Sequence, residues 1–224
     1  MTASLIALGL YFTGYCLLHS LLASRRCKRW CLQHWPALMP AYRGLYNLLA
    51  VLLLLPLLWL YLQASGPLLL QWSGWTGWLM NGIAVAALVG FFSTSGDYSM
   101  AEFSGSRQWR LRHFGARDPD QQAVLKLGRW HRRVRHPWYF LALVLIWSRP
   151  MDAAQLLLSV LATLYFVVGS RLEERKLIAQ FGEAYRQYCR QVPGLIPLPG
   201  RTISATRAQE LEQQANQSDV NGSA

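Results

Sequence analysis

The residues that could carry out chemistry gather in the C-terminal half of the sequence, in two groups separated by an apolar stretch. His136 and Tyr139 lie on either side of a proline in the first group, and Glu173 and Glu174 are adjacent in the second. We place both glutamates at the C-terminal end of an apolar helix, where a carboxylate opposes the helix dipole. A bound cation, such as an ammonium ion, would explain their position. The pattern therefore suggests a site for a positively charged ligand.

Each of these residues also has a purely structural interpretation. Proline is favoured at the first position of a helix because it needs no N–H there, so His136 could simply cap a helix that starts at Pro137. Tyr139 could be one of the aromatic residues that line a membrane boundary. Glu173 and Glu174 could pair with basic residues at helical spacing. These basic residues are Arg171, Arg175 and Lys176.

The sequence lacks the motifs of several common enzyme classes. It contains no Gly-rich phosphate- or dinucleotide-binding loop and no G-x-S-x-G nucleophile motif. Cys27 and Cys31 are four residues apart and form no C-x-x-C pair, so we expect the four cysteines to be reduced thiols. His131 and His136 have no obvious third ligand. We therefore predict neither a metal site nor a soluble nucleotide-binding enzyme.

Four apolar runs are long enough to hold these residues at a membrane. Of the 224 residues, 53% are hydrophobic and only 15% are charged, against about 25% charged residues in a typical soluble domain. A helix that crosses the hydrocarbon core needs about 20 apolar residues. The last run is interrupted at 148–152, so we interpret it as two helices, the first of them short for a full crossing. The four runs are Ala3 to Ala23, Leu45 to Gln63, Trp75 to Ser95 and Trp138 to Gly169.

These runs predict an all-α fold, a polytopic membrane bundle of five transmembrane helices with a C-terminal helical hairpin. We expect a single domain over residues 1–203. The tail over 204–224 is polar and has no aromatic residue. Because such a segment cannot bury enough apolar surface to fold alone, we expect it to be disordered.

Basic residues alternate sharply between the predicted loops. Segments 24–44, 96–137 and 171 onward carry five, nine and seven of the 22 Lys and Arg residues, whereas 64–74 carries none and 148–152 carries one. Because Lys and Arg favour cytoplasmic loops, we place the N-terminus outside and the C-terminus in the cytoplasm. The net charge of +11 then needs no nucleic acid, since basic loops beside a membrane face the anionic headgroups of membrane lipids.

The order of the motifs resembles the C-terminal half of the integral-membrane methyltransferases. These include the isoprenylcysteine carboxyl methyltransferases and relatives that act on phospholipid amines or on methanethiol. The resemblance covers residues 128–200, and the N-terminal part, with Leu18-His19-Ser20, looks like bacterial methanethiol methyltransferases and NnrU-like proteins. The C-terminal motifs are Arg135-His136-Pro137 with Tyr139, Glu173-Glu174-Arg175, Phe181-Gly182 with Tyr185 and Tyr188, and Val192-Pro193 with Leu195-Ile196-Pro197.

This resemblance implies S-adenosylmethionine (SAM) as the methyl donor, held by residues 128–200. At the matching positions it implies that Glu173 and Glu174 bind the ammonium group or ribose of SAM, and that Leu195 and Ile196 close the pocket. It also implies a lining of nearby residues. These are the side chains of His136, Pro137 and Tyr139 and the backbone of Val134 and Arg135.

Methyl transfer from a sulfonium requires positioning more than a strong acid or base. Our candidate catalytic residues are Arg171, which could hold a substrate carboxylate, and Glu174, which could accept a proton or orient an amine. Many relatives have a glycine where this chain has Leu141. This departure bears on how closely the helices approach and on the substrate class.

We expect a SAM-dependent membrane methyltransferase of the bacterial inner membrane that acts on a small thiol or lipid-soluble acceptor, such as methanethiol or an isoprenylcysteine carboxylate. The alternative is a non-enzymatic, NnrU-like membrane protein that assists a respiratory or transport process. Polar residues in the spans, such as His19 and Asn47, are too few for an obvious ion path. The sequence leaves the acceptor's identity and the oligomeric state open.

Overall fold

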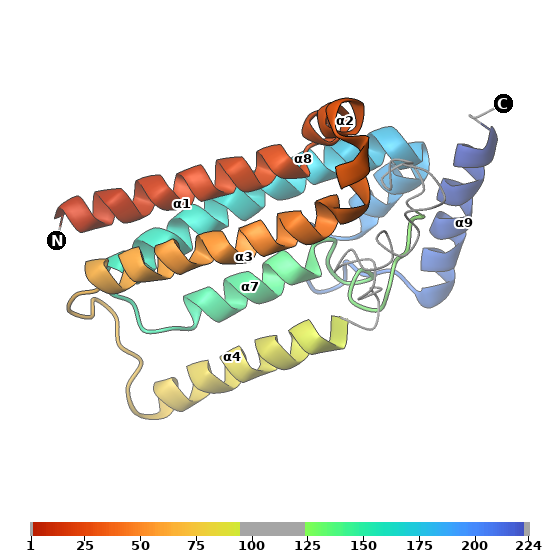
Figure 1. Cartoon of the computed structure of the whole chain (residues 1–224). Helices are drawn as coiled ribbons and strands as arrows, with labels where there is room; N and C mark the ends of the chain where they lie inside the picture. The colour runs from red at the N-terminus through yellow and green to blue at the C-terminus, as the bar shows by residue number, and fades with distance from the viewer. Residues whose placement is uncertain (1, 95–123, 222–224) are drawn as a thin grey trace. The chain divides into compact units, whose positions relative to one another are not determined.

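The computed structural model describes residues 2–94 and 124–221. All regular elements in these ranges are helices, apart from an isolated β-bridge between Leu70 and Met151. Figure 1 shows the helices and their labels. They are α1 (Thr2–Ala23), α2 (Arg25–His34), the 3-10 turn η1 (Pro36–Leu38), α3 (Met39–Ala64), α4 (Gly74–Thr94), α7 (Pro137–Trp147), α8 (Ala153–Gln191) and α9 (Ala205–Asn221).

Four of these helices, α1, α3, α4 and α8, are long and apolar enough to cross a membrane. The apolar helix α7 has 11 residues and would rise about 16 Å, roughly half the thickness of a hydrocarbon core. The all-α polytopic bundle is therefore confirmed. The hairpin of α7 and α8 also has the short first arm that the apolar run predicts.

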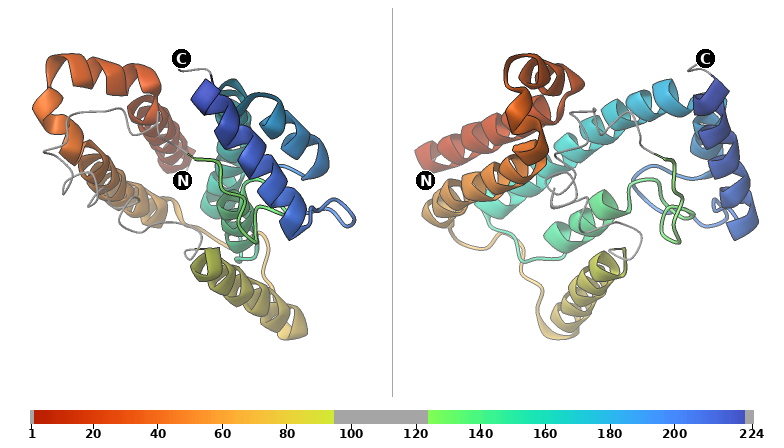
Figure 2. Two further views of the ribbon diagram at one scale, coloured as in Figure 1. Left: turned by 90° about the vertical axis from the view of Figure 1, so that its right-hand side faces the viewer. Right: turned by 45° about the vertical axis from the view of Figure 1, so that its right-hand side comes forward.

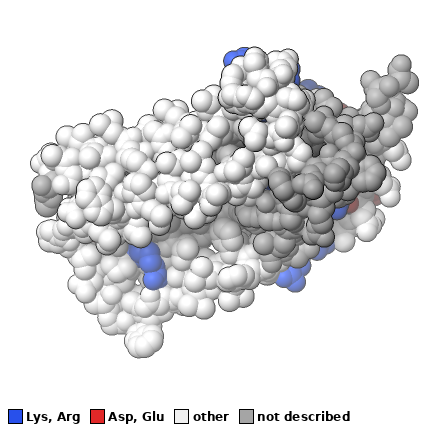
Figure 3. Space-filling view, in the orientation of Figure 1, with Lys and Arg blue, Asp and Glu red and all other residues white. Residues whose placement is uncertain are grey.

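The apolar helices bury few of their side chains within the protein. In the apolar 18-residue windows of the four long helices, between 6% and 17% of the residues are buried. Trp78 and Phe92 in α4 are 82% and 78% exposed, and charged side chains cover little of the face shown in Figure 3. Exposed apolar surface on this scale indicates contact with lipid or a partner. Because it follows helices of membrane length, we conclude that the chain is a membrane protein.

Helix α8 is longer than predicted. We expected the apolar run to end at Gly169 and the helix to end at Glu173 and Glu174, but the helix continues to Gln191 and is divided at Gly182, which has φ 59° and ψ −133°. Glycine adopts such angles readily because it has no Cβ. The polar continuation escapes a search for apolar runs. Glu173 and Glu174 thus lie inside a helix, and the helix dipole gives no reason to expect a cation beside them.

The C-terminal tail is folded over 205–221, so the prediction of disorder is wrong for these residues. Leu211 and Ala215 in α9 are fully buried and pack in one core with Tyr188 and Val192. Figure 2 shows α9 beside the C-terminal part of α8. The tail supplies only a few apolar residues, but a partner surface already exists for them. Composition alone cannot reveal this partner.

Helix α9 also holds the chain that leads to α7. The N–H groups of Leu125 and Leu127 donate to the side chains of Asn216, at 3.0 Å, and Glu212. These bonds join an extended segment to the tail helix, and both leucines are buried. The tail therefore supports the segment that precedes the candidate site.

The described residues form two compact units, the first made of 2–81 and 149–162 and the second of 82–94, 124–148 and 163–221. In the first unit, α1 and α3 run side by side (Figure 1), and Leu8 is fully buried in an apolar cluster between helices. The hydroxyl of Tyr11 in α1 donates to the carbonyl of Leu53 in α3 at 2.9 Å. The second unit contains all the residues predicted for the site.

Leu141 packs against a glycine on a neighbouring helix in the second unit. Its side chain is 3% exposed, and its Cδ2 atom lies 2.8 Å from the place where a Cβ would stand on Gly90 in α4. The indole of Trp130 lies 3.4 Å from the same point. Leu141 departs from the family pattern described above, and in this contact α4 provides the glycine and α7 the large side chain. The side chain of Leu141 therefore lies directly against the backbone of α4 at Gly90.

We expect the Gly90 and Leu141 side chains to be energetically coupled. Gly90→Val should destabilise the fold by about 1–3 kcal/mol through overlap, and Leu141→Ala should cost about 2–5 kcal/mol through a cavity. The double variant should lose less than the two single changes together, because the valine partly fills the cavity. Thermal unfolding in detergent measures the stability of the wild type, the two single variants and the double variant. Strictly additive losses would show that the two positions do not pack together.

We also expect α9 to protect the segment before α7. Leu211→Ala should destabilise the second unit by about 2–5 kcal/mol and speed hydrogen exchange at the amides of Leu125 and Leu127. The exposed Gln209→Ala variant is the matched control in the same helix. Unchanged exchange at both amides in the Leu211 variant would contradict a supporting role for α9.

Candidate functional site

Backbone hydrogen bonds fix the chain where it enters α7. Pro137 occupies the start of this helix, and the carbonyl of His136 accepts the N–H of Phe140 at 3.1 Å. On the other side, the N–H of Arg135 donates to the carbonyl of Pro193 at 2.9 Å, and that of His136 donates to Gly194 at 3.1 Å. Proline needs no hydrogen bond at this helix position. The entry to α7 is thereby held against the segment that follows α8.

Gly194 allows this close approach. A Cβ at this position would stand 3.2 Å from Nη2 of Arg135 and 3.7 Å from Oε1 of Glu174. A larger residue would therefore push the guanidinium away from its partner. The Val192-Pro193-Gly194 motif brings its backbone, rather than its side chains, to the site.

Arg135 and Glu174 form a largely buried ion pair. Oε1 of Glu174 accepts from Nε and Nη2 of Arg135, each at 2.8 Å, and the two side chains are 13% and 17% exposed. Nη1 of Arg135 donates to the carbonyls of Cys189 at 2.7 Å and Val192 at 2.5 Å. One guanidinium thus joins the entry to α7, the middle of α8 and the end of α8. Charge-assisted bonds of this kind are the strong ones in proteins.

His136 lies between the two glutamates. Its Nε2 is 3.0 Å from Oε1 of Glu174 and its Nδ1 is 3.5 Å from Oε2 of Glu173, while the imidazole is 7% exposed. Burial alone lowers the pKa of His136, but hydrogen bonds and charges from Glu173 and Glu174 outweigh burial and raise the pKa above its ordinary value. The imidazole therefore holds its proton to a higher pH than an isolated histidine does.

Glu173 is the more open of the two acids. Its side chain is 49% exposed, and the hydroxyl of Tyr139 donates to Oε2 at 3.3 Å. Both of these contacts of Glu173 are at the long end of hydrogen-bonding distance. A cation from outside the protein could come closer than either. Glu173 is thus placed to accept a charged group of a ligand.

Three rings form a continuous stack beside Glu173. The ring centroids of His136 and Tyr139 are 5.3 Å apart with planes at 7°, and those of Tyr139 and Phe166 are 4.8 Å apart at 11°. The faces of tyrosine and phenylalanine rings attract cations and stack on flat apolar groups. The carboxylate of Glu173 and the ring stack together form a surface suited to a ligand that has both a positive charge and a flat apolar group.

The structure brings together five of the residues singled out in the sequence, namely Arg135, His136, Tyr139, Glu173 and Glu174. Others are placed differently. Val134 and Pro137 are buried, Leu195 directly follows Gly194 and is half-buried, and Ile196 is exposed. Arg171 is also exposed, and within the described residues it forms no ion pair with either glutamate.

Sequence reasoning missed Phe166 and the backbone acceptors at Cys189 and Val192. Phe166 precedes Glu173 by seven residues, or two helical turns, so the two share a face of α8. This spacing could have identified Phe166. No sequence signal marks a carbonyl as an acceptor for arginine, because every residue has the same backbone carbonyl.

A family model and several known proteins match this chain over most of its length. The sequence family described as "Protein of unknown function (DUF1295)" matches residues 24–192. The chain is 33% identical to methanethiol S-methyltransferase 2 of Bradyrhizobium diazoefficiens, over 80% of this chain and 68% of that protein. It is 31% identical to a methanethiol S-methyltransferase of a Pseudomonas species, over 82% and 70%. It is 30% identical to that of Mycobacterium tuberculosis, over 90% and 80%. No solved structure matches the chain significantly.

The raised pKa of His136 predicts a loss of stability in alkaline solution. An imidazole that gains acidic partners on folding contributes stability that is fully present below its unfolded pKa, about 6.5, and that is lost as the pH rises through its folded pKa. The melting temperature of the wild type in detergent should therefore fall more steeply above pH 6.5 than that of His136→Gln. Identical slopes in the two proteins would show that the His136 proton is not bound more tightly in the fold.

Proposed function

Because the chain belongs to the DUF1295 family and to the family of the methanethiol S-methyltransferases, we propose that it is a membrane methyltransferase that passes a methyl group from SAM to a small thiol. The observation that carries this proposal is the half-exposed carboxylate of Glu173 beside the stack of His136, Tyr139 and Phe166. The names of the relatives supply the thiol.

The residues present fit a ligand such as SAM. This molecule carries an ammonium group and a sulfonium, and Glu173 offers a carboxylate whose contacts with His136 and Tyr139 are 3.5 Å and 3.3 Å. An ammonium group can make a shorter, charge-assisted bond to the same oxygens. When bound, SAM would supply an activated methyl group. Glu173 would hold its charged end.

The other predicted residues would shape the walls of the same site. The rings of His136 and Tyr139 would lie along the ligand, and Leu195 and Ile196 would cover it with apolar surface. Val134 and Pro137 are buried, so they would support the site through packing and backbone position. These residues would thus have two roles. The first group would contact the ligand, and Val134 and Pro137 would hold that group in place.

The contacts of Glu174 with Arg135 and His136 support a positioning role for Glu174. Three nitrogen atoms converge on Oε1 of Glu174, two from Arg135 and one from His136, so this carboxylate is a weak base in this arrangement. Arg171, which is exposed and close in sequence to both acids, remains our candidate for orienting the acceptor. We propose that Glu174 contributes to catalysis by holding His136 and Arg135 in place.

A thiol acceptor suits a site of this kind. A thiol needs only to lose its proton to become a strong nucleophile, and transfer from a sulfonium then depends on the relative position of the two reactants. The polar groups of the cluster are already paired with one another, so it offers position rather than a free base. The distribution of Lys and Arg supports a site on the cytoplasmic side of a bacterial inner membrane.

The second candidate function is that of a non-enzymatic, NnrU-like membrane protein. One observation favours it, namely that Arg135, His136 and the two glutamates satisfy one another without a ligand. In that case the cluster would only fasten α8 to α7, and SAM would not bind. Binding and turnover by the purified protein separate the two functions.

We expect Glu173→Gln to weaken SAM binding by about tenfold or more, because one charge-assisted hydrogen bond contributes about 1.5–3 kcal/mol. Its melting temperature should remain near that of the wild type, since Glu173 is half-exposed. Glu174→Gln should instead lower the melting temperature markedly, because it leaves Arg135 without its partner. Titration calorimetry in detergent measures SAM binding, and gas chromatography of dimethyl sulfide measures the methylation of methanethiol.

Glu183→Gln is the matched control. Glu183 also lies in α8 and pairs with Arg186 and Arg190, but its ion pairs are exposed. This variant should bind SAM and methylate methanethiol as the wild type does. Wild-type binding by Glu173→Gln would remove Glu173 from the site, and absence of SAM binding by the wild-type protein would leave the non-enzymatic function.

A further inference from the structure

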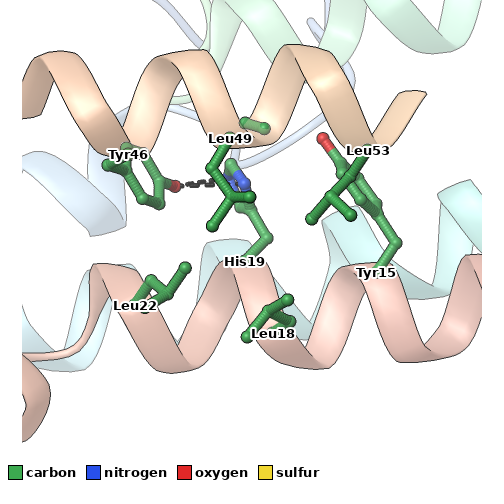
Figure 4. A pocket seen from close by; sticks show the side chains of 8 residues that line it. Tyr15, Leu18, His19, Leu22, Tyr46, Leu49 and Leu53 are labelled. Atoms are coloured by element: carbon green, nitrogen blue, oxygen red, sulfur yellow. Dashed lines mark hydrogen bonds between the residues drawn. The ribbon is translucent and has the colours of Figure 1, made fainter. Parts of the chain in front are cut away.

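The hollow between α1 and α3 has no room for a ligand larger than water. It lies beside His19 and Tyr46, whose side chains are hydrogen-bonded to each other (Figure 4). Its volume is about 10 Å³, and one water molecule needs about 10–15 Å³. A hollow in the second unit is larger, at about 130 Å³. This larger hollow admits a group of several non-hydrogen atoms.

Arginine supplies most of the polar lining of the larger hollow, which we call the arginine hollow. Its lining residues are Arg129, Arg132, Arg133, Thr202 and Ile203. Arg132 is half-buried, whereas Arg129 and Arg133 are exposed, so a ligand can enter from outside. Three guanidinium groups around one space repel one another unless an anion lies among them. The lining therefore indicates an anionic ligand.

No carboxylate of the described residues neutralises these three arginines. Within 2–94 and 124–217, where side chains are described, none of the three forms an ion pair. The described glutamates of the second unit have other partners. Glu173 and Glu174 contact His136, Glu183 contacts Arg190, Glu210 contacts Arg207, and Glu212 accepts from the N–H of Leu127. The positive charge of the hollow is thus available to a ligand.

Backbone hydrogen bonds hold the arginine hollow in shape. The N–H of Ile203 donates to the carbonyl of Arg132 at 3.1 Å, and the N–H of Arg132 donates to the carbonyl of Gly128 at 3.2 Å. The N–H of Arg133 donates to the carbonyl of Trp130 at 2.9 Å. The chain before α7 thus forms a tight turn that is fixed to the segment before α9. A site that is already ordered loses less entropy when a ligand binds.

The arginine hollow lies near the start of an apolar helix. Arg133 precedes Pro137, the first residue of α7, by four residues, so the chain keeps their Cα atoms within about 14 Å of each other. The ends of an apolar helix in a membrane lie near the lipid headgroups. Basic pockets in such positions bind the headgroups of anionic lipids.

We propose that the arginine hollow binds a phosphate group. Guanidinium groups match phosphate oxygens with pairs of parallel hydrogen bonds, and the hydroxyl of Thr202 offers a further donor. This phosphate has two sources, the headgroup of an anionic phospholipid and a soluble phosphate. The proposal does not depend on the proposed function, because no lining residue of the hollow belongs to the methyl-donor site. A bound phosphate would steady the turn that leads into Arg135 and His136.

The first experiment measures the binding of two probes to the full chain in detergent. Native mass spectrometry detects bound phosphatidylglycerol, and phosphorus NMR detects bound inorganic phosphate. The wild type should bind at least one probe, and Arg132→Gln should bind that probe about tenfold or more weakly, because it loses charge-assisted hydrogen bonds. Lys126→Gln is the matched control. It removes one exposed positive charge from the same segment but does not line the hollow, so it should bind as the wild type does.

The two probes separate the two sources of phosphate. If Arg132→Gln weakens the binding of phosphatidylglycerol alone, the hollow takes a lipid headgroup, and if it weakens the binding of inorganic phosphate, the hollow takes soluble phosphate. Either result supports the proposal. The proposal fails if the wild type binds neither probe, or if Arg132→Gln binds both as the wild type does. Equal losses in Arg132→Gln and Lys126→Gln would also overturn it, because scattered surface charge would then explain the binding.

Two further variants separate the site from charge and from folding. Arg132→Lys keeps the positive charge but lacks the planar fork, so it should bind the same probe severalfold more weakly than the wild type. Arg133 is exposed, so Arg133→Gln should lose affinity while its melting temperature stays at the wild-type value. This variant decides the matter if Arg132→Gln unfolds. Wild-type affinity in both Arg132→Lys and Arg133→Gln would contradict a built phosphate site.

Discussion

The buried ion pair between Arg135 and Glu174 is the interaction on which the candidate site depends. The guanidinium also bonds to the carbonyls of Cys189 and Val192, so one side chain connects the start of α7 with two parts of α8. Removing one partner of such a pair typically costs about 3–5 kcal/mol, because the remaining charge stays buried. With Glu174 neutralised by Arg135, Glu173 is the acid that faces outward beside the aromatic stack.

Residue patterns predict those parts of the fold that follow from one physical requirement. A helix in lipid must be apolar along its whole length, so α1, α3 and α4 and the α7–α8 hairpin can be located from apolar runs. Proline at the start of α7 is predictable for a similar reason, since it lacks an N–H to satisfy. The grouping of His136, Tyr139 and the two glutamates follows from the family resemblance, and the structure brings these side chains together.

Other features depend on partners that a linear pattern does not name. Helix α9 folds because α8 and the segment before α7 offer a surface for Leu211, although the tail itself is polar. Helix α8 continues past Glu174 to Gln191. A search for apolar runs misses this continuation because its residues are mostly polar. Leu141 departs from the family pattern, and its large side chain fits because Gly90 on α4 lies opposite. In each case the deciding contact is with a residue distant in sequence.

A structure of the protein with S-adenosylhomocysteine, the demethylated product of SAM, would test the central claim most directly. We predict density for this ligand with its ammonium group bonded to Glu173 and with the rings of His136 and Tyr139 in contact with it, while the Arg135–Glu174 pair stays intact. Density for the ligand away from Glu173, or a Glu173 carboxylate that faces no ligand group at saturating concentration, would contradict the site.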